Sequence, residues 1–317
     1  MKVEYLKDRY SGERIFILGN GPSLKHTPLE RLSDEYTFSV NNIANIFDQT
    51  DWHPSFYLGI HSPPSIPKKN IMKMVNLDIP CFLPMDDLNF VPDRDNTMRL
   101  TLKNLVDMDK VDISVLDVNW ESVDDFHDIW SIDVTDIVYH YTTVLYPVMQ
   151  LAHYMGFSEF YLLGCDMYDE WNLHMLFDKG DDPALFRSDK PTKIGRIYEF
   201  FSSAEYPLRS CLNGVAYELL DSVVFRKAQP HLMKIDDCFA NPAHFYDTYD
   251  VGQYLAGNKR RNKEICQSHE LAREASSKLG FNIYNATLGG DLEVHPRVDL
   301  YDLLNIKRPP EPETTIK

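Results

Sequence analysis

Residues 14–24, with the sequence RIFILGNGPSL, decide the fold. The segment starts as an apolar run of strand length, and then two glycines bracket an asparagine and are followed by Pro22 and Ser23, which can open a helix. Glycine lets the backbone approach an anion closely, Ser23 can cap the next helix, and the N-terminus of a helix favours negative charge. The segment therefore predicts a strand, a turn and a helix that hold a phosphate group. An ordinary turn after a strand has a similar composition, and the segment matches neither the dinucleotide fingerprint nor the P-loop.

The length and charge of the chain limit the kinds of protein it can be. It has 317 residues, of which 44% are hydrophobic and 25% are charged, enough for one large α/β domain with an elaboration or for two domains. The net charge of −16 argues against a nucleic-acid-binding surface, so we expect no nucleic-acid partner. A nucleotide would have to be bound by local hydrogen-bond donors rather than by a basic surface.

The cysteines and the apolar runs indicate a cytoplasmic protein. The cysteines are odd in number and scattered, without C-x-x-C spacing, which is typical of reduced thiols rather than of disulfides or a zinc site: Cys81, Cys165, Cys211, Cys238 and Cys266. The N-terminus is too charged for a signal peptide, and no apolar run approaches the length of a membrane span. We expect a homo-oligomer without a transmembrane segment, and peripheral membrane association stays open.

Further apolar runs predict more strands of a sheet. Residues 36–40 form a second strand that ends at Asn41, and residues 54–60 and 79–83 predict a third and a fourth. Asn41 would place an amide at the carboxyl edge of the sheet, where open α/β folds bind ligands, although asparagine also tolerates a turn conformation. Residues 85–137 are rich in Asp and Asn, and we interpret them as loops with short elements.

A helix followed by a strand is predicted in the middle of the chain. Apolar residues recur at helical spacing within 144–157, and Thr142 or Thr143 is a suitable N-cap. Residues 159–163 then form a buried strand that runs into Gly-Cys-Asp at 164–166. This unit is typical of a doubly wound sheet, so we predict an α/β fold with a Rossmann-like, mostly parallel sheet.

The pattern changes after this strand, which predicts an inserted segment. Residues 169–240 contain a polar break, and we interpret them as a lid-like insertion on the acceptor side. Residues 1–168 and 241–305 would form the Rossmann-like nucleotide-binding domain, with a charged amphipathic helix at 260–279 and a last strand directly after it. Residues 306–317 have the composition of a flexible tail.

Separate stretches of the chain together resemble a known family. They are residues 16–24, 150–166 and 283–294, and they resemble the DUF115 family, which is named after archaeal 6-hydroxymethylpterin diphosphokinase and includes motility-associated factor glycosyltransferases. The sequence HFYD at 244–247 fits the His-Phe motif that this family carries before its last helix.

The same order of landmarks is similar, at a lower level, to the bacterial sialyltransferases of glycosyltransferase family 42. Those enzymes carry a Gly-Asn-Gly-Pro-Ser-Leu turn, an asparagine after the second strand, a Thr-Ser pair before the central helix, and Gly-x-Asp-x-Tyr after the following strand. The matching positions here are 19–24, Asn41, Thr142 with Thr143, and 164–168.

This resemblance implies a cytidine nucleotide at the carboxyl edge of the sheet. Carried over by position, Asn20, Asn41, Thr142 and Thr143 would contact the nucleotide, and Tyr168 its phosphate. The candidate nucleotide-binding residues are Gly19, Asn20, Gly21, Pro22, Ser23, Asn41, Thr142, Thr143, Gly164, Cys165, Tyr168 and Tyr246. Tyr168 and Tyr246 could instead be core aromatic residues with a solvated hydroxyl.

Two residues are candidates for the chemistry itself. The sialyltransferase histidine aligns near Lys263, so His244 or His269 would have to replace it, and we select His244 as the candidate general base. Asp166 is the best placed carboxylate, and it would hold Mg²⁺ if the reaction were a pyrophosphate transfer. His244 could instead be a packed, hydrogen-bonded histidine, and Asp166 could cap a helix or a turn.

These observations predict a nucleotide-dependent transferase with no permanently bound cofactor. The first hypothesis is a glycosyltransferase that uses a CMP-activated acidic sugar, with a glycan or small molecule as acceptor, for the synthesis of surface glycans. The alternative is a Mg²⁺- and ATP-dependent diphosphokinase that acts on 6-hydroxymethylpterin. A third hypothesis is a nucleotide-binding module without catalytic activity.

Overall fold

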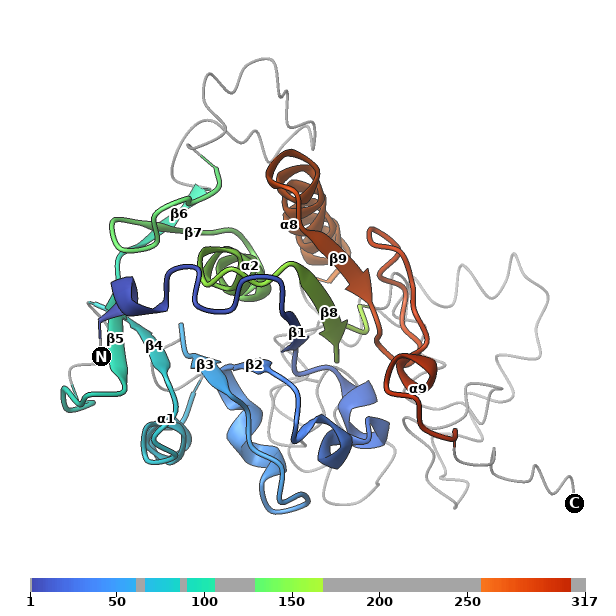
Figure 1. The fold of residues 1–317 in the computed structure, drawn as a ribbon, viewed down its shortest axis with the longest axis horizontal. Helices are drawn as coiled ribbons and strands as arrows, with labels where there is room; N and C mark the ends of the chain where they lie inside the picture. Colours follow the sequence, from blue (N-terminus) through green and yellow to red (C-terminus); the bar gives the residue numbers. More distant parts are fainter. Residues whose placement is uncertain (1, 61–65, 86–89, 106–128, 168–257, 309–317) are drawn as a thin grey trace, which may run out of the picture.

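The structure is a computed structural model that describes residues 2–60, 66–85, 90–105, 129–167 and 258–308, with the backbone alone for Pro22 and for 258–263. The predicted insertion at 169–240 therefore lies outside the described residues, as does most of the predicted tail. Figure 1 shows the arrangement of the elements.

The predicted parallel sheet is confirmed. It is seven-stranded with the order β5-β4-β3-β2-β1-β8-β9, and every neighbouring pair is parallel. The strands are β1 (Arg14–Leu18), β2 (Thr37–Val40), β3 (Phe56–Leu58), β4 (Cys81–Pro84), β5 (Thr97–Leu100), β8 (Glu159–Leu163) and β9 (Asn282–Asn285). A separate two-stranded parallel sheet pairs β6 (Leu102–Asn104) with β7 (Val138–His140).

The order of the strands creates a switch point beside β1. The chain runs outward from β1 to β5 and then returns to the other side of β1, where β8 pairs with it in a register that sets Leu18 opposite Leu163. Connections that leave two adjacent parallel strands in opposite directions open a crevice at the carboxyl ends of those strands. The loops that begin at Gly19 and Gly164 therefore meet at the place where such sheets bind ligands.

Helices cover both faces of the sheet, as a doubly wound fold requires (Figure 1). On one face, α2 (Leu145–Tyr154) and α8 (Asn258–Leu279) pack against alternate strand residues such as Ile15 and Ile17. On the other face, residues such as Phe16 and Leu18 pack with α1 (Lys68–Val75), α9 (Leu300–Leu303) and 3₁₀ helices. The latter are η2 (Pro22–His26), η3 (Leu29–Leu32) and η4 (Asn41–Ile46), and η1 (Val3–Leu6) lies near the N-terminus.

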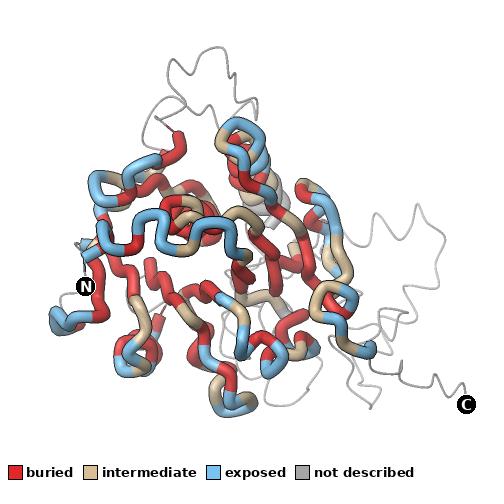
Figure 2. Tube along the Cα trace, in the orientation of Figure 1, coloured by how far each residue is buried: buried red, intermediate tan, exposed pale blue. Residues whose placement is uncertain are grey.

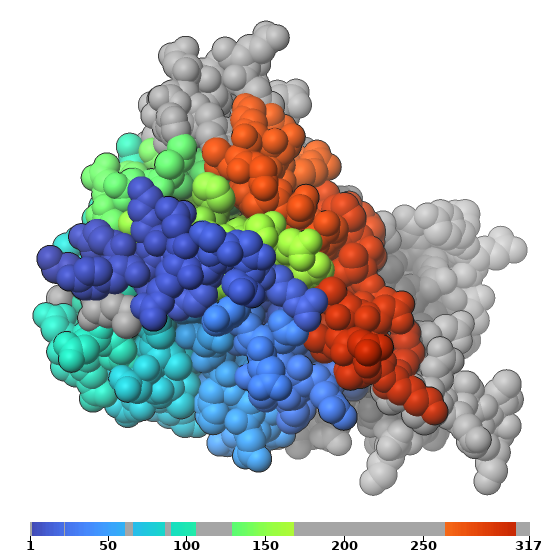
Figure 3. Space-filling model, in the orientation of Figure 1, coloured from blue at the N-terminus to red at the C-terminus, as the bar shows by residue number. Residues whose placement is uncertain are grey.

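The sheet is buried on both faces, which explains why its strands read as continuous apolar runs. Figure 2 shows buried residues along the strands and exposed residues on the outer turns. Figure 3 shows the N-terminal segment lying across one side of the molecule, where the backbone N–H of Asp8 donates to the carbonyl of Tyr154 at 3.0 Å. This contact fixes the end of α2 to the segment that leads into β1.

The structure differs from the sequence-based expectation at the helix after the Gly-Asn-Gly turn. Instead of a helix capped by Ser23, residues 22–26 form the short 3₁₀ helix η2, whose N-cap residue is Gly21 and in which Ser23 is an internal residue. Within the described part of the chain, no helix is both long and apolar enough to cross a membrane.

Candidate functional site

The loops after β1 and β8 are hydrogen-bonded to each other at the switch point. The backbone N–H of Gly19 donates to the carbonyl of Leu163, and that of Gly21 donates to the carbonyl of Gly164, both at 2.8 Å. A Cβ at Gly19 would clash with the carbonyl oxygen of Gly164, and a Cβ at Gly21 would lie 2.6 Å from the same oxygen. The glycines are therefore required by the contact between two loops of the chain itself, whether or not an anion also binds nearby.

Asp166 occupies the anion-binding position that the sequence assigned to a phosphate. Its carboxylate is buried and accepts hydrogen bonds from the backbone N–H of Ser23 at 3.1 Å and from the Ser23 hydroxyl at 2.9 Å. The backbone N–H of Ser23 is thereby bound within the protein. These contacts are those of a turn cap, and a catalytic or Mg²⁺-binding role for Asp166 stays a prediction.

Asn20 lies between the two glycines and presents an acceptor at the switch point. Its Nδ2 donates to the carbonyl of Val40 at 3.2 Å, which ties the loop after β1 to the end of β2. Its Oδ1 is buried, and within the part of the chain that the structure describes it has no hydrogen-bond partner. A buried polar atom without a partner is costly, so a ligand with a hydrogen-bond donor would stabilise this site.

Asn41 follows β2 and adopts a left-handed backbone conformation, with φ of +47°. Its Oδ1 accepts from the backbone N–H of Ile60 at 3.3 Å, and its carbonyl accepts from the hydroxyl of Tyr57 at 2.8 Å. Both contacts join the end of β2 to the end of β3. The observed conformation is the one that asparagine tolerates in turns, and a contact between Asn41 and nucleotide stays a prediction.

A cluster of amide side chains behind Asn41 is not evident from the sequence. Nδ2 of Asn70, on α1, donates to Oδ1 of Asn42 at 3.2 Å and to Oδ1 of Asn45 at 2.8 Å. Asn70 is buried, so these bonds hold η4 against α1. The sequence shows that the asparagines at 41, 42 and 45 are close along the chain. It does not show their pairing with Asn70, because that pairing depends on tertiary structure.

Thr142 and Thr143 lie in a tight turn before α2. Thr142 has φ of +45°, which is strained for a β-branched residue, and the N–H of Thr143 donates to the carbonyl of Tyr141 at 2.5 Å. The N-cap residue of α2 is Val144, one position after the predicted threonines, and the hydroxyl of Thr143 accepts from the N–H of Leu145 at 3.3 Å.

This turn lies at the same edge of the sheet as Asn20. The helix α2 packs on β1 and leads through a short turn into β8, so it runs antiparallel to the strands and begins at their carboxyl ends. Hydrogen bonds join this turn to α2 and α8. Among the described residues, no hydrogen bond links Thr142 directly to Asn20, whose amide binds Val40.

Cys165 is buried after the end of β8, and its contact with a nucleotide stays a prediction. Its backbone N–H donates to the hydroxyl of Thr287 at 3.1 Å, and its thiol lies 3.4 Å from the carbonyl of Leu163. Burial raises the pKa of the thiol to about 12, so Cys165 is protonated at neutral pH and is a poor nucleophile. Its preceding residue, Gly164, has φ of +63°, with Leu24 packed directly against it.

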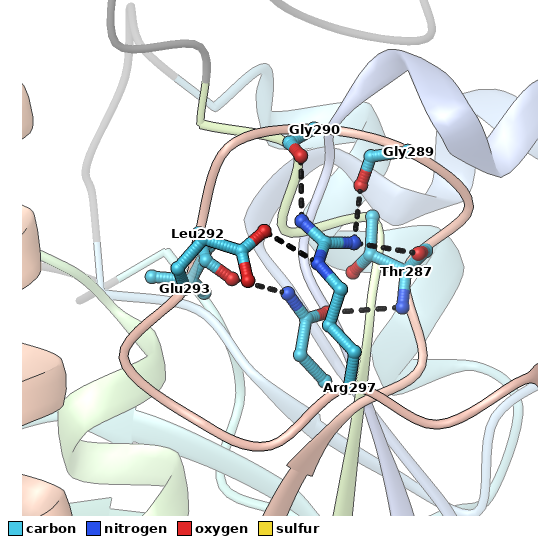
Figure 4. Close-up of polar contacts among 7 residues, drawn as sticks. Thr287, Gly289, Gly290, Leu292, Glu293 and Arg297 are labelled. Carbon is cyan, nitrogen blue, oxygen red and sulfur yellow. Dashed lines mark hydrogen bonds and ion pairs between the residues drawn. The ribbon is translucent and has the colours of Figure 1, made fainter.

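The loop after β9 closes on the loop after β8. The N–H of Asp291 donates to the carbonyl of Asp166 at 2.7 Å, and Gly290 packs so closely on this carbonyl that a Cβ would clash with it. Figure 4 shows the guanidinium of Arg297 inside the loop, where it donates to the carbonyls of Gly289 at 2.9 Å and Gly290 at 2.5 Å. Nε of Arg297 also forms an ion pair with Glu293 at 2.6 Å, so Arg297 holds several parts of this loop together.

A pair of buried histidines links this loop to α8. Nδ1 of His269 and Nε2 of His295 are 3.0 Å apart, and both side chains are almost fully buried. Burial lowers the pKa of His269 to about 4, and burial together with the neighbouring His269 and Arg273 lowers the pKa of His295. His269, the alternative base, is therefore neutral but packed against another histidine, and His295 was not recognised from the sequence.

Several predicted site residues lie outside the described residues. They are His244, Tyr168 and Tyr246, and their roles stay predictions. In the described part of the chain, no three His, Cys, Asp or Glu side chains converge as a group that could hold a metal ion.

No protein-family model matches the chain, and no curated protein matches it. Among solved structures, the MAf glycosyltransferase of Magnetospirillum magneticum is similar at 10% identity and a TM-score of 0.42, over 94% of this chain. This chain spans 37% of the length of that protein. The sialyltransferase CST-II in complex with CMP is similar at 12% identity and a TM-score of 0.39, over 90% of this chain and 86% of that one.

A further similar structure is the sialyltransferase CstII of Campylobacter jejuni in complex with a substrate analogue, cytidine-5'-monophosphate. It shares 14% identity at a TM-score of 0.21, over 50% of this chain and 63% of that one. Similarity at this level assigns no residue role in this chain. The resemblance to the DUF115 family has no support from a family model and stays a prediction from the sequence motifs.

Proposed function

We propose that the protein is a glycosyltransferase that binds a CMP-activated acidic sugar at the carboxyl edge of its sheet and transfers the sugar to a surface glycan. The observation that carries the proposal is Asn20 at the switch point between β1 and β8, with Oδ1 buried and without a partner in residues 2–60, 66–85, 90–105, 129–167 and 258–308. An acceptor in this position suits a donor group of the nucleotide, such as a ribose hydroxyl or the amino group of cytosine.

The surrounding geometry supports a rigid binding edge. Asn20 is oriented by its bond to Val40, and the turn that carries it is held by the buried contact between Ser23 and Asp166. The cytidine nucleotide is what the resemblance of these sequence motifs to the sialyltransferases of glycosyltransferase family 42 implies. In this proposal His244 is the general base that deprotonates the acceptor hydroxyl, and Tyr168 binds the phosphate.

The proposal is tested by calorimetric titration of CMP into the full chain and into Asn20→Ala. We expect the substitution to weaken CMP binding about tenfold or more, because one hydrogen bond to the ligand is lost. Asn96→Ala is the matched control, since Nδ2 of Asn96 also donates to a backbone carbonyl, that of Val75 at 2.9 Å, but beside β4 and β5. It should lower stability and leave the affinity for CMP unchanged. Equal affinity of Asn20→Ala and the unmodified protein would contradict the assignment of Asn20.

The diphosphokinase alternative gives a different result when ATP replaces CMP in the titration. It requires ATP binding that depends on Mg²⁺, held by a carboxylate such as that of Asp166. Because the Asp166 carboxylate is bound by Ser23, we do not expect it to bind the metal without breaking that contact.

A further inference from the structure

Two buried glutamines in the structure differ in how completely they are hydrogen-bonded. Gln150 on α2 is fully buried, with Oε1 accepting from the N–H groups of Ser131 and Tyr139 and Nε2 donating to the carbonyls of Tyr139 and Tyr146, at 2.8–3.1 Å. Gln267 on α8 is also buried, at 4% exposure, and its Oε1 accepts from the hydroxyl of Tyr141 at 2.6 Å. Its Nε2 is buried and has no hydrogen-bond partner among the described residues. Among the described residues, Gln267 Nε2 is one of several buried side-chain atoms without a partner, and like Asn20 Oδ1 it belongs to an amide, a group that is normally satisfied when it is buried.

Gln267 lies at the carboxyl edge of the sheet. The helix α8 ends at Leu279, just before β9, and packs on that strand, so it runs antiparallel to it. His269, two residues from Gln267, contacts His295, which follows the carboxyl end of β9. Residues 267–269 therefore lie at the level of the loops that form the candidate site.

The same helix holds the turn that carries Thr142. The hydroxyl of Ser268 donates to the carbonyl of Tyr141 at 2.8 Å, while Gln267 binds the Tyr141 side chain. These contacts secure the residue before the strained Thr142, whose φ is +45°. They also fix the orientation of Gln267, because its oxygen is directed to Tyr141 and its two N–H groups must then point elsewhere.

From this geometry we propose that Gln267 binds the base of the nucleotide, with Nε2 donating to an uncharged acceptor such as a ring nitrogen or carbonyl oxygen of a pyrimidine. This proposal rests on the proposed function and adds a contact from α8. A base acceptor fits better than a phosphate, because a neutral amide in a buried position compensates poorly for the desolvation of a charged group. Cytosine supplies such acceptors in its N3 and O2 atoms.

The test compares CMP with ribose 5-phosphate, which lacks the base, in the full chain and in Gln267→Glu. The carboxylate of the variant retains an acceptor for Tyr141 but loses the N–H groups. We expect CMP to bind about tenfold more weakly to Gln267→Glu, while ribose 5-phosphate, measured by competition at high concentration, binds both proteins equally. Gln150→Glu is the matched control, and it should lower stability without changing the ratio of the two affinities.

Gln267→Met is the second variant, in case a carboxylate prevents folding, and it should show the same selective loss of CMP affinity. Unchanged CMP affinity in both variants would overturn the proposal, and so would an equal loss for CMP and ribose 5-phosphate, which is the signature of a structural role. If the unmodified protein binds no cytidine nucleotide, the proposed function itself fails and the assignment of Gln267 fails with it. If it binds CMP but the variants do so equally well, only the assignment of Gln267 fails.

Discussion

The contact between Ser23 and Asp166 shows how a single side chain can replace an external anion. Turns that expose N–H groups attract negative charge, and here the charge comes from a buried carboxylate of the neighbouring loop. Removal of the carboxylate would leave the N–H and hydroxyl of Ser23 buried without a partner. This cost is larger than the net gain of an ordinary hydrogen bond.

We therefore predict that Asp166→Ala lowers the free energy of unfolding by about 2–4 kcal/mol, because it leaves buried donors unpaired. Chemical denaturation of the purified variant measures this value. Asp34→Ala is the control, since Asp34 is exposed, and it should change stability by less than about 0.5 kcal/mol. A loss for Asp166→Ala no larger than that of the control would show that the carboxylate does not hold the turn.

The buried pair of His269 and His295 predicts sensitivity to acid. Both side chains have pKa values lowered by burial, so the unfolded chain binds more protons than the folded chain as the pH falls below about 6.5. Stability should be fully present above that pH and should fall towards pH 4, by about 1.4 kcal/mol per pH unit for each histidine. Urea denaturation between pH 7 and pH 4.5 measures the slope.

A variant separates this effect from general acid denaturation. His295→Gln removes one of the two groups that must take up a proton on unfolding, so its stability should depend less steeply on pH over the same range. Parallel pH profiles for the variant and the unmodified protein would contradict the presence of a buried neutral pair.

At the scale of the elements, the loop after β9 provides a matched comparison of two glycines. Gly289 and Gly290 have the same φ of +77°, but a Cβ at Gly289 would meet no atom within 4 Å, whereas a Cβ at Gly290 would clash with the carbonyl of Asp166. The difference between the two substitutions therefore isolates the cost of pushing this loop away from the loop after β8.

We predict that Gly289→Ala lowers the free energy of unfolding by about 1–2 kcal/mol, because alanine is unfavourable in the left-handed backbone conformation. Gly290→Ala should cost about 1–3 kcal/mol more, because the Asp166 carbonyl must move as well. Both values come from chemical denaturation. The Gly290 variant should also bind CMP more weakly, and equal effects of the two substitutions on stability would mean that the loops are not in close contact.

At the scale of the whole molecule, the sequence predicts most strands of the sheet, including β9 at one edge, but not β5 at the other. β1, β2 and β8 lie inside the sheet and are buried on both faces, so their apolar runs are unmistakable. β5, at one edge of the sheet, includes a partly exposed arginine and lies in a stretch that reads as loops. The helix α1 is short and rich in lysine, so its apolar, buried face is difficult to recognise in the sequence.

The sequence predicts which residues gather at the candidate site, but not the hydrogen bonds that they form there. The positions of Gly19, Asn20 and Asp166 follow from where strands end, and the sheet brings them to one edge. The bond between Ser23 and Asp166 joins residues 143 positions apart, and no local pattern encodes it. The expected cap by Ser23 was wrong, because Ser23 lies inside η2 and its N–H and hydroxyl donate to Asp166.

We propose that the carboxyl edge at β1 and β8 binds a cytidine nucleotide. The most direct measurement is a thermal-shift panel of CMP, CDP, UDP, GDP and ATP, each with and without Mg²⁺. We predict that CMP raises the melting temperature by about 5 °C at a hundredfold excess over its dissociation constant, without Mg²⁺. Stabilisation by ATP only in the presence of Mg²⁺, or no stabilisation by either cytidine nucleotide, would contradict this account.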